Sequence, residues 1–283
     1  MRDKSYYSVR TGKNPAGASL DLATLLRVLR GMHEAWEDEG YFQEAFGYDC
    51  VDSGFTPGSL GKDIEAVLLL ELRKTNLLPF RSRIESYSED DIFDVLEFLY
   101  EHVSKPVDRT YHNWSECGWH CSTFDRADGR AEFRDKVNRI LRRYNAGYEL
   151  STDGEILNLP DAGFEALMGA ALPKSDPENI EARVEAARRK FRRHRSTLDE
   201  RRDAIRDLAD VLEYLRPRLK GVLTSQDEND LFNIANNFGL RHHNALQKAR
   251  YDKPIWYSWL FYYYLATIHA VVRLIGEGRP SAP

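Results

Sequence analysis

Residues 255–275 read IWYSWLFYYYLATIHAVVRLI, an almost continuous apolar stretch that is long enough to cross a membrane as a helix. His269 and Arg273 lie inside it, and its tyrosines gather in the middle instead of at the two ends, where membrane helices carry their aromatic residues. A helix that is apolar on nearly every side is also typical of a buried core helix. We therefore expect the core helix of a helical domain and no membrane partner.

Upstream of this stretch the apolar spacing predicts three more helices, over about 178–195, 197–219 and 228–250. Ser175 with Glu178, or Asp176 with Pro177, can start the first of them. We place a domain boundary near Pro173, with a C-terminal helical bundle over 173–283 and a mixed domain over 1–172.

The N-terminal domain is expected to be α+β with one β-hairpin. Its hairpin strands, Tyr148–Ser151 and Glu155–Leu159, flank the turn signal Thr152-Asp153-Gly154. Ser88 with Asp91 forms a capping box before a helix that ends by Pro106. Further helices are expected over 21–36, 62–74 and 130–144, the second of them buried because of its dense apolar run. The fold class is therefore mainly α.

Composition indicates an ordinary globular protein of 283 residues, 42% hydrophobic and 30% charged. Three cysteines are too few and too unevenly placed for a disulfide framework. The first residues, MRDKSYYSVRTGKN, lack the apolar core of a signal peptide, so we expect a cytoplasmic protein.

Charge is distributed unevenly along the chain. Residues 173–283 hold 20 Lys/Arg against 15 Asp/Glu, whereas residues 1–172 hold 20 against 30. Residues 188–195, RRKFRRHR, carry six of the basic side chains. Such a run is either a solvated helix face or a phosphate-binding surface, because arginine offers phosphate a bidentate fork. The residues that we expect to bind RNA are Arg188, Arg189, Arg192, Arg193 and Arg195.

Residues 230–247, DLFNIANNFGLRHHNALQ, hold the candidate catalytic group. On a helix, Asn237, Arg241 and Asn244 share one polar side, His243 lies at its margin, and His242 falls on the apolar face. One interpretation makes His242 a silent core residue and the asparagines a surface cover. The other treats the segment as a site, since asparagine is a poor helix former and Arg with His can handle anionic charge and protons. The candidate catalytic residues are Arg241, His242, His243, Asn244 and Asn237.

Two blocks of sequence resemble a known family. FNIANNFGLRHHN (232–244), followed by YDKPIWYSWLFYYYLATIHAVVRL (251–274), resembles a HEPN domain. FDVLEFLYEHVSKP (93–106), CGWHCSTFD (117–125) and GYELSTDGEI (147–156) resemble the N-terminal part of AbiJ-type abortive-infection proteins. The resemblance covers about two thirds of the chain.

This resemblance implies an RNA-directed anti-phage or toxin effector, with RNA as partner, a homodimer, and an antitoxin or phage-derived trigger acting through a sensing or regulatory N-terminal domain. Many HEPN domains are metal-independent endoribonucleases, in which the RNA 2′-OH attacks the neighbouring phosphate while His moves protons and Arg steadies the charge. We accordingly expect no cofactor.

The chain departs from the family motif, in which His follows Arg after four to six residues. Leu246, Gln247 and Lys248 occupy those positions after Arg241. Either His242 or His243 takes the proton-transfer role, or the protein is a non-catalytic RNA- or protein-binding dimeric module. His269 could reach Arg241 if the last two helices pack antiparallel, but a lone His among Tyr and Val is more typical of a core.

One cluster has the residue types of a metal site: His112, Cys117, His120 and Cys121. Zinc needs four converging nitrogen or sulfur ligands, but adjacent residues such as His120 and Cys121 rarely reach one tetrahedral ion. The spacing matches no familiar zinc pattern, and Trp114 and Trp119 indicate packing. We favour structural burial for this cluster and assign no metal ligand.

Overall fold

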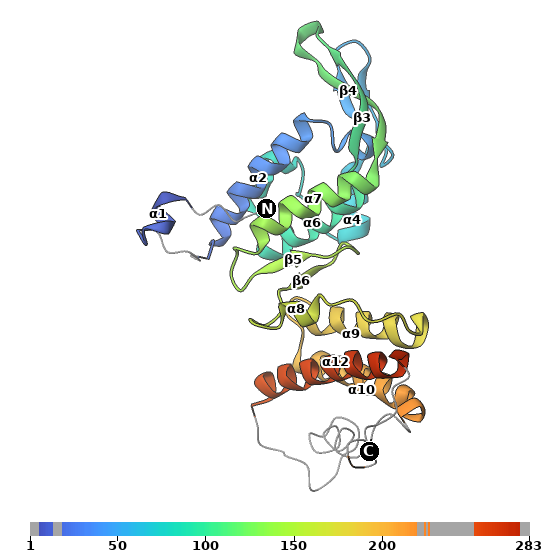
Figure 1. Ribbon diagram of the computed structural model, residues 1–283. Helices are drawn as coiled ribbons and strands as arrows, with labels where there is room; N and C mark the ends of the chain where they lie inside the picture. The colour runs from blue at the N-terminus through green and yellow to red at the C-terminus, as the bar shows by residue number, and fades with distance from the viewer. Residues whose placement is uncertain (1–5, 14–18, 220–223, 225, 227–251, 278–283) are drawn as a thin grey trace. The chain divides into compact units, whose positions relative to one another are not determined.

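The structure is a computed structural model that describes residues 6–13, 19–219, 224, 226 and 252–277. Helices dominate it, with short antiparallel strand pairs between them (Figure 1). The chain divides into two compact units, Met1–Leu157 and Asn158–Pro283. The mainly-α class expected from the sequence is confirmed.

The first unit is built around three long helices, and their apolar stripes make its core. Asp21 caps one of them through its side chain, and Ser88 with Asp91 forms the predicted capping box on another. The helices are α1 (Tyr7–Arg10), α2 (Leu22–Asp38), α3 (Gln43–Phe46), α4 (Ile64–Leu72), α5 (Phe80–Arg83), α6 (Glu89–His102) and α7 (Arg126–Leu141), with 3-10 turns η1 (Ile84–Ser86) and η2 (Trp114–Glu116). Fully buried side chains such as Leu25, Leu96 and Phe133 join α2, α6 and α7.

Among the described residues, three two-stranded sheets accompany these helices. The strands are β1 (Tyr48–Cys50), β2 (Gly54–Thr56), β3 (Lys105–His112), β4 (Gly118–Asp125), β5 (Tyr148–Leu150) and β6 (Ile156–Asn158). The pair β5–β6 is the predicted hairpin. The expectation of one hairpin is wrong, because β1–β2 and the longer β3–β4 also form. Most β3 side chains are exposed, so this strand lacks the apolar alternation that reveals a half-buried strand.

Helix α4 forms where the sequence predicts a helix, but it is not buried as expected. Leu68 is buried, whereas Leu69 and Leu70 are 52% and 81% exposed. Apolar residues in an unbroken run must face every side of a helix, so only part of the run can reach one core.

In the described part of the second unit, three long helices pack around one apolar core. Its elements are α8 (Glu165–Met168), the π-helical turn η3 (Pro177–Glu181), α9 (Ala182–Arg192), α10 (Leu198–Leu219) and α12 (Lys253–Glu277). Helix α10 contacts both α9 and α12 (Figure 1). Phe191 on α9 stacks on Phe261 of α12 with ring centroids 4.0 Å apart.

The unit begins upstream of the boundary expected near Pro173. Phe164 stacks on Tyr262 at 4.1 Å, and the backbone N–H of Asp161 donates to the Tyr262 hydroxyl. These contacts attach the segment before Pro173 to α12.

Among the described helices, α12 alone is long and apolar enough to cross a membrane by length and composition. Half of its apolar window is buried within the protein, and Leu260, Phe261 and Leu265 are fully buried. This burial agrees with a core helix, as its sequence suggests.

Candidate functional site

The expected catalytic residues Arg241, His242, His243, Asn244 and Asn237 all lie outside the residues that the structure describes. Their predicted helix, over about 228–250, lies there too. The expected RNA-binding residues are described, and they fall at the C-terminal end of α9 and in the loop after it.

Two arginines of this basic segment are engaged with their own unit. The Arg188 guanidinium donates to the Ala170 carbonyl oxygen at 2.8 Å and pairs with Glu185 at 3.4 Å, leaving its side chain 11% exposed. The Nε of Arg192 donates to the Asn158 carbonyl oxygen at 2.8 Å. These two side chains therefore help to hold the unit together.

The end of the segment is more open. Arg193 and Arg195 are exposed, and Arg189 is half-buried. Arg195 adopts a left-handed backbone with φ of 55° just after α9 ends. Some arginines of the segment therefore bond within their own unit and others face solvent. The segment as a whole matches neither a solvated helix face nor a continuous phosphate-binding surface.

Arg188 also contacts the histidine of α12. Its Nη2 lies 3.2 Å from His269 Nε2. Because arginine stays protonated, a hydrogen bond between them has the guanidinium as donor and the imidazole Nε2 as acceptor, which assigns the His269 proton to Nδ1. Burial lowers the pKa of His269, and the nearby charges of Arg188 and Arg273 lower it further.

The contact gives His269 a partner that the sequence did not indicate. His269 is half-buried and contacts a cationic side chain from another helix, whereas Arg241, the partner expected from the sequence, lies outside the described residues. Arg188 was singled out for charge density alone, and only the packing of α9 and α12 onto α10 brings it to His269.

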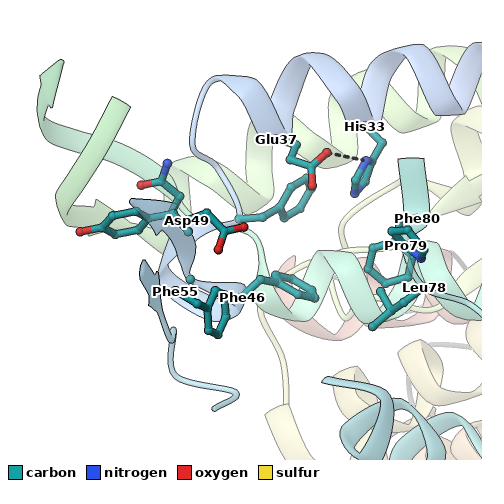
Figure 2. A pocket seen from close by; sticks show the side chains of 12 residues that line it. His33, Glu37, Phe46, Asp49, Phe55, Leu78, Pro79 and Phe80 are labelled. Carbon is teal, nitrogen blue, oxygen red and sulfur yellow. Dashed lines mark ion pairs between the residues drawn. The ribbon is translucent and has the colours of Figure 1, made fainter. Parts of the chain in front are cut away.

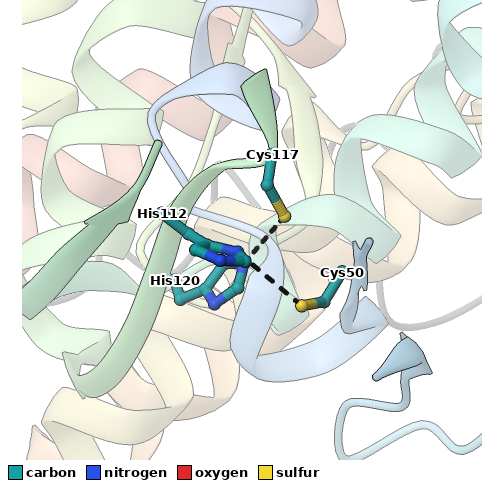
Figure 3. A group of neighbouring side chains, drawn as sticks. All are labelled: Cys50, His112, Cys117 and His120. Atoms are coloured by element: carbon teal, nitrogen blue, oxygen red, sulfur yellow. Dashed lines mark hydrogen bonds between the residues drawn. The ribbon is translucent and has the colours of Figure 1, made fainter. Parts of the chain in front are cut away.

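A second constellation lies in the first unit, where β1 meets the turn of the β3–β4 hairpin. The ligand atoms of Cys50, His112, Cys117 and His120 all lie within 4.8 Å of one another. Figure 3 shows the sulfur atoms of Cys50 and Cys117 directed toward the two imidazole rings of His112 and His120. Cys117 Sγ is 3.2 Å from His120 Nε2, and Cys50 Sγ is 3.9 Å from His112 Nδ1.

The membership of this group differs from the sequence-based cluster. Cys121 is not in it, because successive side chains on a strand point to opposite faces, and its Sγ lies against Gly40. Burial raises the pKa of the Cys121 thiol. Cys50 takes the fourth place instead. No spacing rule could have found it, because β1 lies far upstream of the hairpin.

Neighbouring residues contact both imidazole rings and the Cys50 thiol. His112 Nε2 lies 3.2 Å from the Asp52 carboxylate, and the Tyr48 ring packs on His120 with centroids 4.5 Å apart. Hydrogen bonds from the Ser53 side chain and backbone, with one from the Asp52 backbone, lower the pKa of Cys50 from 9.0 to about 7.

A pocket of about 340 Å³ lies beside this constellation in the first unit. Figure 2 shows His33 and Glu37 from α2 on one side and Phe46, Phe55 and Phe80 opposite them. His33 is buried, and burial together with the charge of Arg81 lowers its pKa from 6.5 to about 4. The pocket has the size of a small-molecule site, with a neutral imidazole in its wall.

Comparisons of the chain with protein-family models, with curated proteins and with solved structures find no match.

Proposed function

We propose that this chain is an RNA-directed effector of an anti-phage or toxin system that acts as a metal-independent endoribonuclease through a HEPN-like C-terminal domain. The observation that supports this best is the contact of 3.2 Å between the Arg188 guanidinium and His269 Nε2. Cleavage by 2′-OH attack needs a base near the attacking hydroxyl and a cation near the phosphate.

The pair can supply both groups once RNA arrives. A phosphate is a better acceptor for guanidinium than a neutral imidazole, since it carries negative charge and can accept two parallel N–H bonds from the guanidinium fork. Transfer of the Arg188 donor from His269 to phosphate frees the Nε2 lone pair. His269 then accepts the proton of the 2′-OH, while Arg188 steadies the negative charge that builds on the phosphorane oxygens.

The exposed arginines beyond α9 would extend this contact along the RNA backbone. Arg193 and Arg195 are the side chains placed for that role. Arg241, His242, His243, Asn244 and Asn237 remain proposed catalytic residues from the sequence, with Arg241 as the group that stabilises charge. A homodimer would bring two copies of these groups into one cleft, and an antitoxin or phage-derived trigger would act through the N-terminal unit.

The test is cleavage of labelled single-stranded RNA by the purified full chain in a buffer free of magnesium. We expect products that end in a 2′,3′-cyclic phosphate, and no cleavage where the attacking nucleotide is 2′-deoxy. His269→Gln and Arg241→Ala should each reduce the rate, and loss of one charge-stabilising donor lowers it about 10²–10³-fold. Arg206→Ala on the exposed face of α10 is the control and should cut at the wild-type rate.

A non-catalytic binding module is the second candidate, and one observation favours it. Arg188 is already satisfied by Ala170 and Glu185, which is how a structural arginine is held. If the wild type binds RNA but never cuts it and never slows growth of the host, the binding module replaces the endoribonuclease.

A further inference from the structure

We propose that Cys50, His112, Cys117 and His120 bind one Zn²⁺ ion, which fastens the turn of the β3–β4 hairpin to the end of β1. This site lies in the first unit and is independent of the RNA chemistry proposed for the second unit. The argument starts from the identity of the four donors, two sulfurs and two ring nitrogens, which is a ligand set that structural zinc sites use.

The spacing of the donors fits a tetrahedral ion. Zinc bonds of about 2.3 Å to sulfur and about 2.0 Å to nitrogen place a sulfur and a nitrogen ligand about 3.5 Å apart. The two sulfur–nitrogen separations at the site, 3.2 Å and 3.9 Å, lie on either side of that value. Shifts of a few tenths of an ångström in the ligand positions would bring both sulfur–nitrogen separations to about 3.5 Å.

The orientation of His112 is the feature that a zinc ligand requires. Its Nδ1 faces Cys50, and its Nε2 lies 3.2 Å from the Asp52 carboxylate. A histidine that binds metal through one nitrogen commonly donates the other N–H to a carboxylate, which fixes its tautomer and ring angle. A histidine that merely fills space has no need of this arrangement.

The backbone between His112 and Cys117 also adopts an energetically unfavourable conformation. Between His112 and Cys117 the hairpin turns through Ser115 and Glu116, with φ of 49° and 55°. Such values are uncommon outside glycine and persist where the surroundings hold the chain in place. Ligands on both sides of these residues, His112 at the end of β3 and Cys117 directly after Glu116, would supply that restraint.

Four protein ligands leave no open coordination position, so the site is structural and not catalytic. Its effect reaches the neighbouring pocket, since Tyr48 both packs on His120 and lines that pocket. Gln43 secures the same strand independently, because its side-chain amide donates to the Trp119 carbonyl oxygen and accepts from the Cys121 N–H. The hairpin is therefore held at two points, one of which depends on the ion.

A disulfide between Cys50 and Cys117 is the competing use of the two sulfurs. It would leave Asp52 to orient a histidine that binds nothing, and both cysteines are free thiols in the structure. The two uses differ in mass and in metal content, so one experiment can separate them.

The experiment is metal analysis of the full chain, purified without chelator from cells grown with zinc. We expect one zinc per chain in the wild type and in Cys121→Ser, the matched control, and less than a tenth of that in Cys50→Ser and Cys117→Ser. Because the two ligand variants could lose zinc through misfolding, the wild type is also loaded with Co²⁺ after removal of zinc. Intense visible ligand-field bands and thiolate charge-transfer bands of a tetrahedral site with two sulfurs are expected.

Three results would overturn the assignment. One is a folded wild type that neither retains zinc nor develops the cobalt spectrum. Another is a Cys50–Cys117 disulfide, detected by mass after alkylation without reductant. The third is equal zinc content in Cys50→Ser and the wild type.

Discussion

The Nε2 atom of His112 lies 3.2 Å from a carboxylate oxygen of Asp52, while the opposite side of the ring faces the sulfur of Cys50. Asp52 itself is 66% exposed at its side chain, so it contributes nothing to the core. Its carboxylate is placed to orient the imidazole, and it can be removed without disturbing buried packing.

Replacing Asp52 by alanine should weaken zinc binding without abolishing it. The four ligands stay, but the His112 ring loses the acceptor that fixes its tautomer, and loss of such a partner typically lowers metal affinity about 10–100-fold. Competition with a chromophoric chelator measures the change. Glu39→Gln, which removes an exposed carboxylate at the end of α2, should leave the affinity unchanged. Equal affinities for Asp52→Ala and wild type would show that the carboxylate does not orient the ring.

The metal site shows where sequence reasoning stops. His112, Cys117 and His120 were visible as a cluster because they lie close together in the chain. Cys50 was not, because only the folding of β1 against the hairpin brings it there. Cys121 was grouped with them by proximity in sequence, although strand geometry turns it to the other face.

The sequence predicts most accurately those helices and hairpins that a single local pattern determines. The capping box of Ser88 and Asp91, and the hairpin around Asp153-Gly154, both formed as expected. Local signals failed for β3, whose side chains are mostly exposed, and for the burial of α4, which depends on how much core the rest of the unit offers. Contacts such as Arg188 with His269 depend on helix packing and could not be read from spacing.

The exposed end of the basic segment gives a prediction about RNA affinity. Reversing Arg193 and Arg195 to glutamate should weaken RNA binding strongly and flatten its dependence on salt. The slope of log K against log salt should fall by about 0.7 for each phosphate of single-stranded RNA that the variant no longer neutralises. Arg192 is left out of this variant because it donates to Asn158 and its loss would disturb the unit. Fluorescence anisotropy at several salt concentrations gives both quantities.

The matched control reverses Arg139 and Arg142, two exposed arginines of the first unit. It changes net charge equally and should have a much smaller effect. Should both double variants weaken binding to the same extent, the basic segment would be a solvated face and only the overall charge would matter.

His33 predicts how the first unit responds to acid. Its pKa is about 4 in the folded protein, against 6.5 as the ordinary value, because burial disfavours the imidazolium. A depressed folded pKa means that the unfolded state takes up the proton first. Stability is therefore full above about pH 6.5 and falls between pH 6.5 and 4, by roughly 2–3 kcal/mol for such a shift.

Thermal melts from pH 7 to pH 4 measure this loss, and His33→Gln should remove much of its pH dependence. Glu37 acts in the opposite sense, since its pKa is raised, but its side chain is 48% exposed and solvent screens its charge. If His33→Gln loses stability between pH 6.5 and 4 as steeply as the wild type, a group other than His33 causes the loss.

The last prediction concerns assembly. The first turns of α12 leave Ile255, Trp256 and Trp259 exposed by 66%, 37% and 41%, although other large apolar residues of the helix, such as Leu260 and Leu265, are buried in the core. Apolar side chains gathered on one exposed stretch favour a protein–protein interface, and a twofold pairing of identical faces is the commonest way to cover them. We expect the full chain to sediment as a dimer, and Ile255→Glu to shift it toward monomer by placing a charge in that interface. Leu70→Glu, at a position 81% exposed on α4, is the control for adding the same charge to another apolar surface and should leave the dimer intact. A wild type that stays monomeric at high micromolar concentration would rule out the interface, and with it the composite RNA cleft that a homodimer would form.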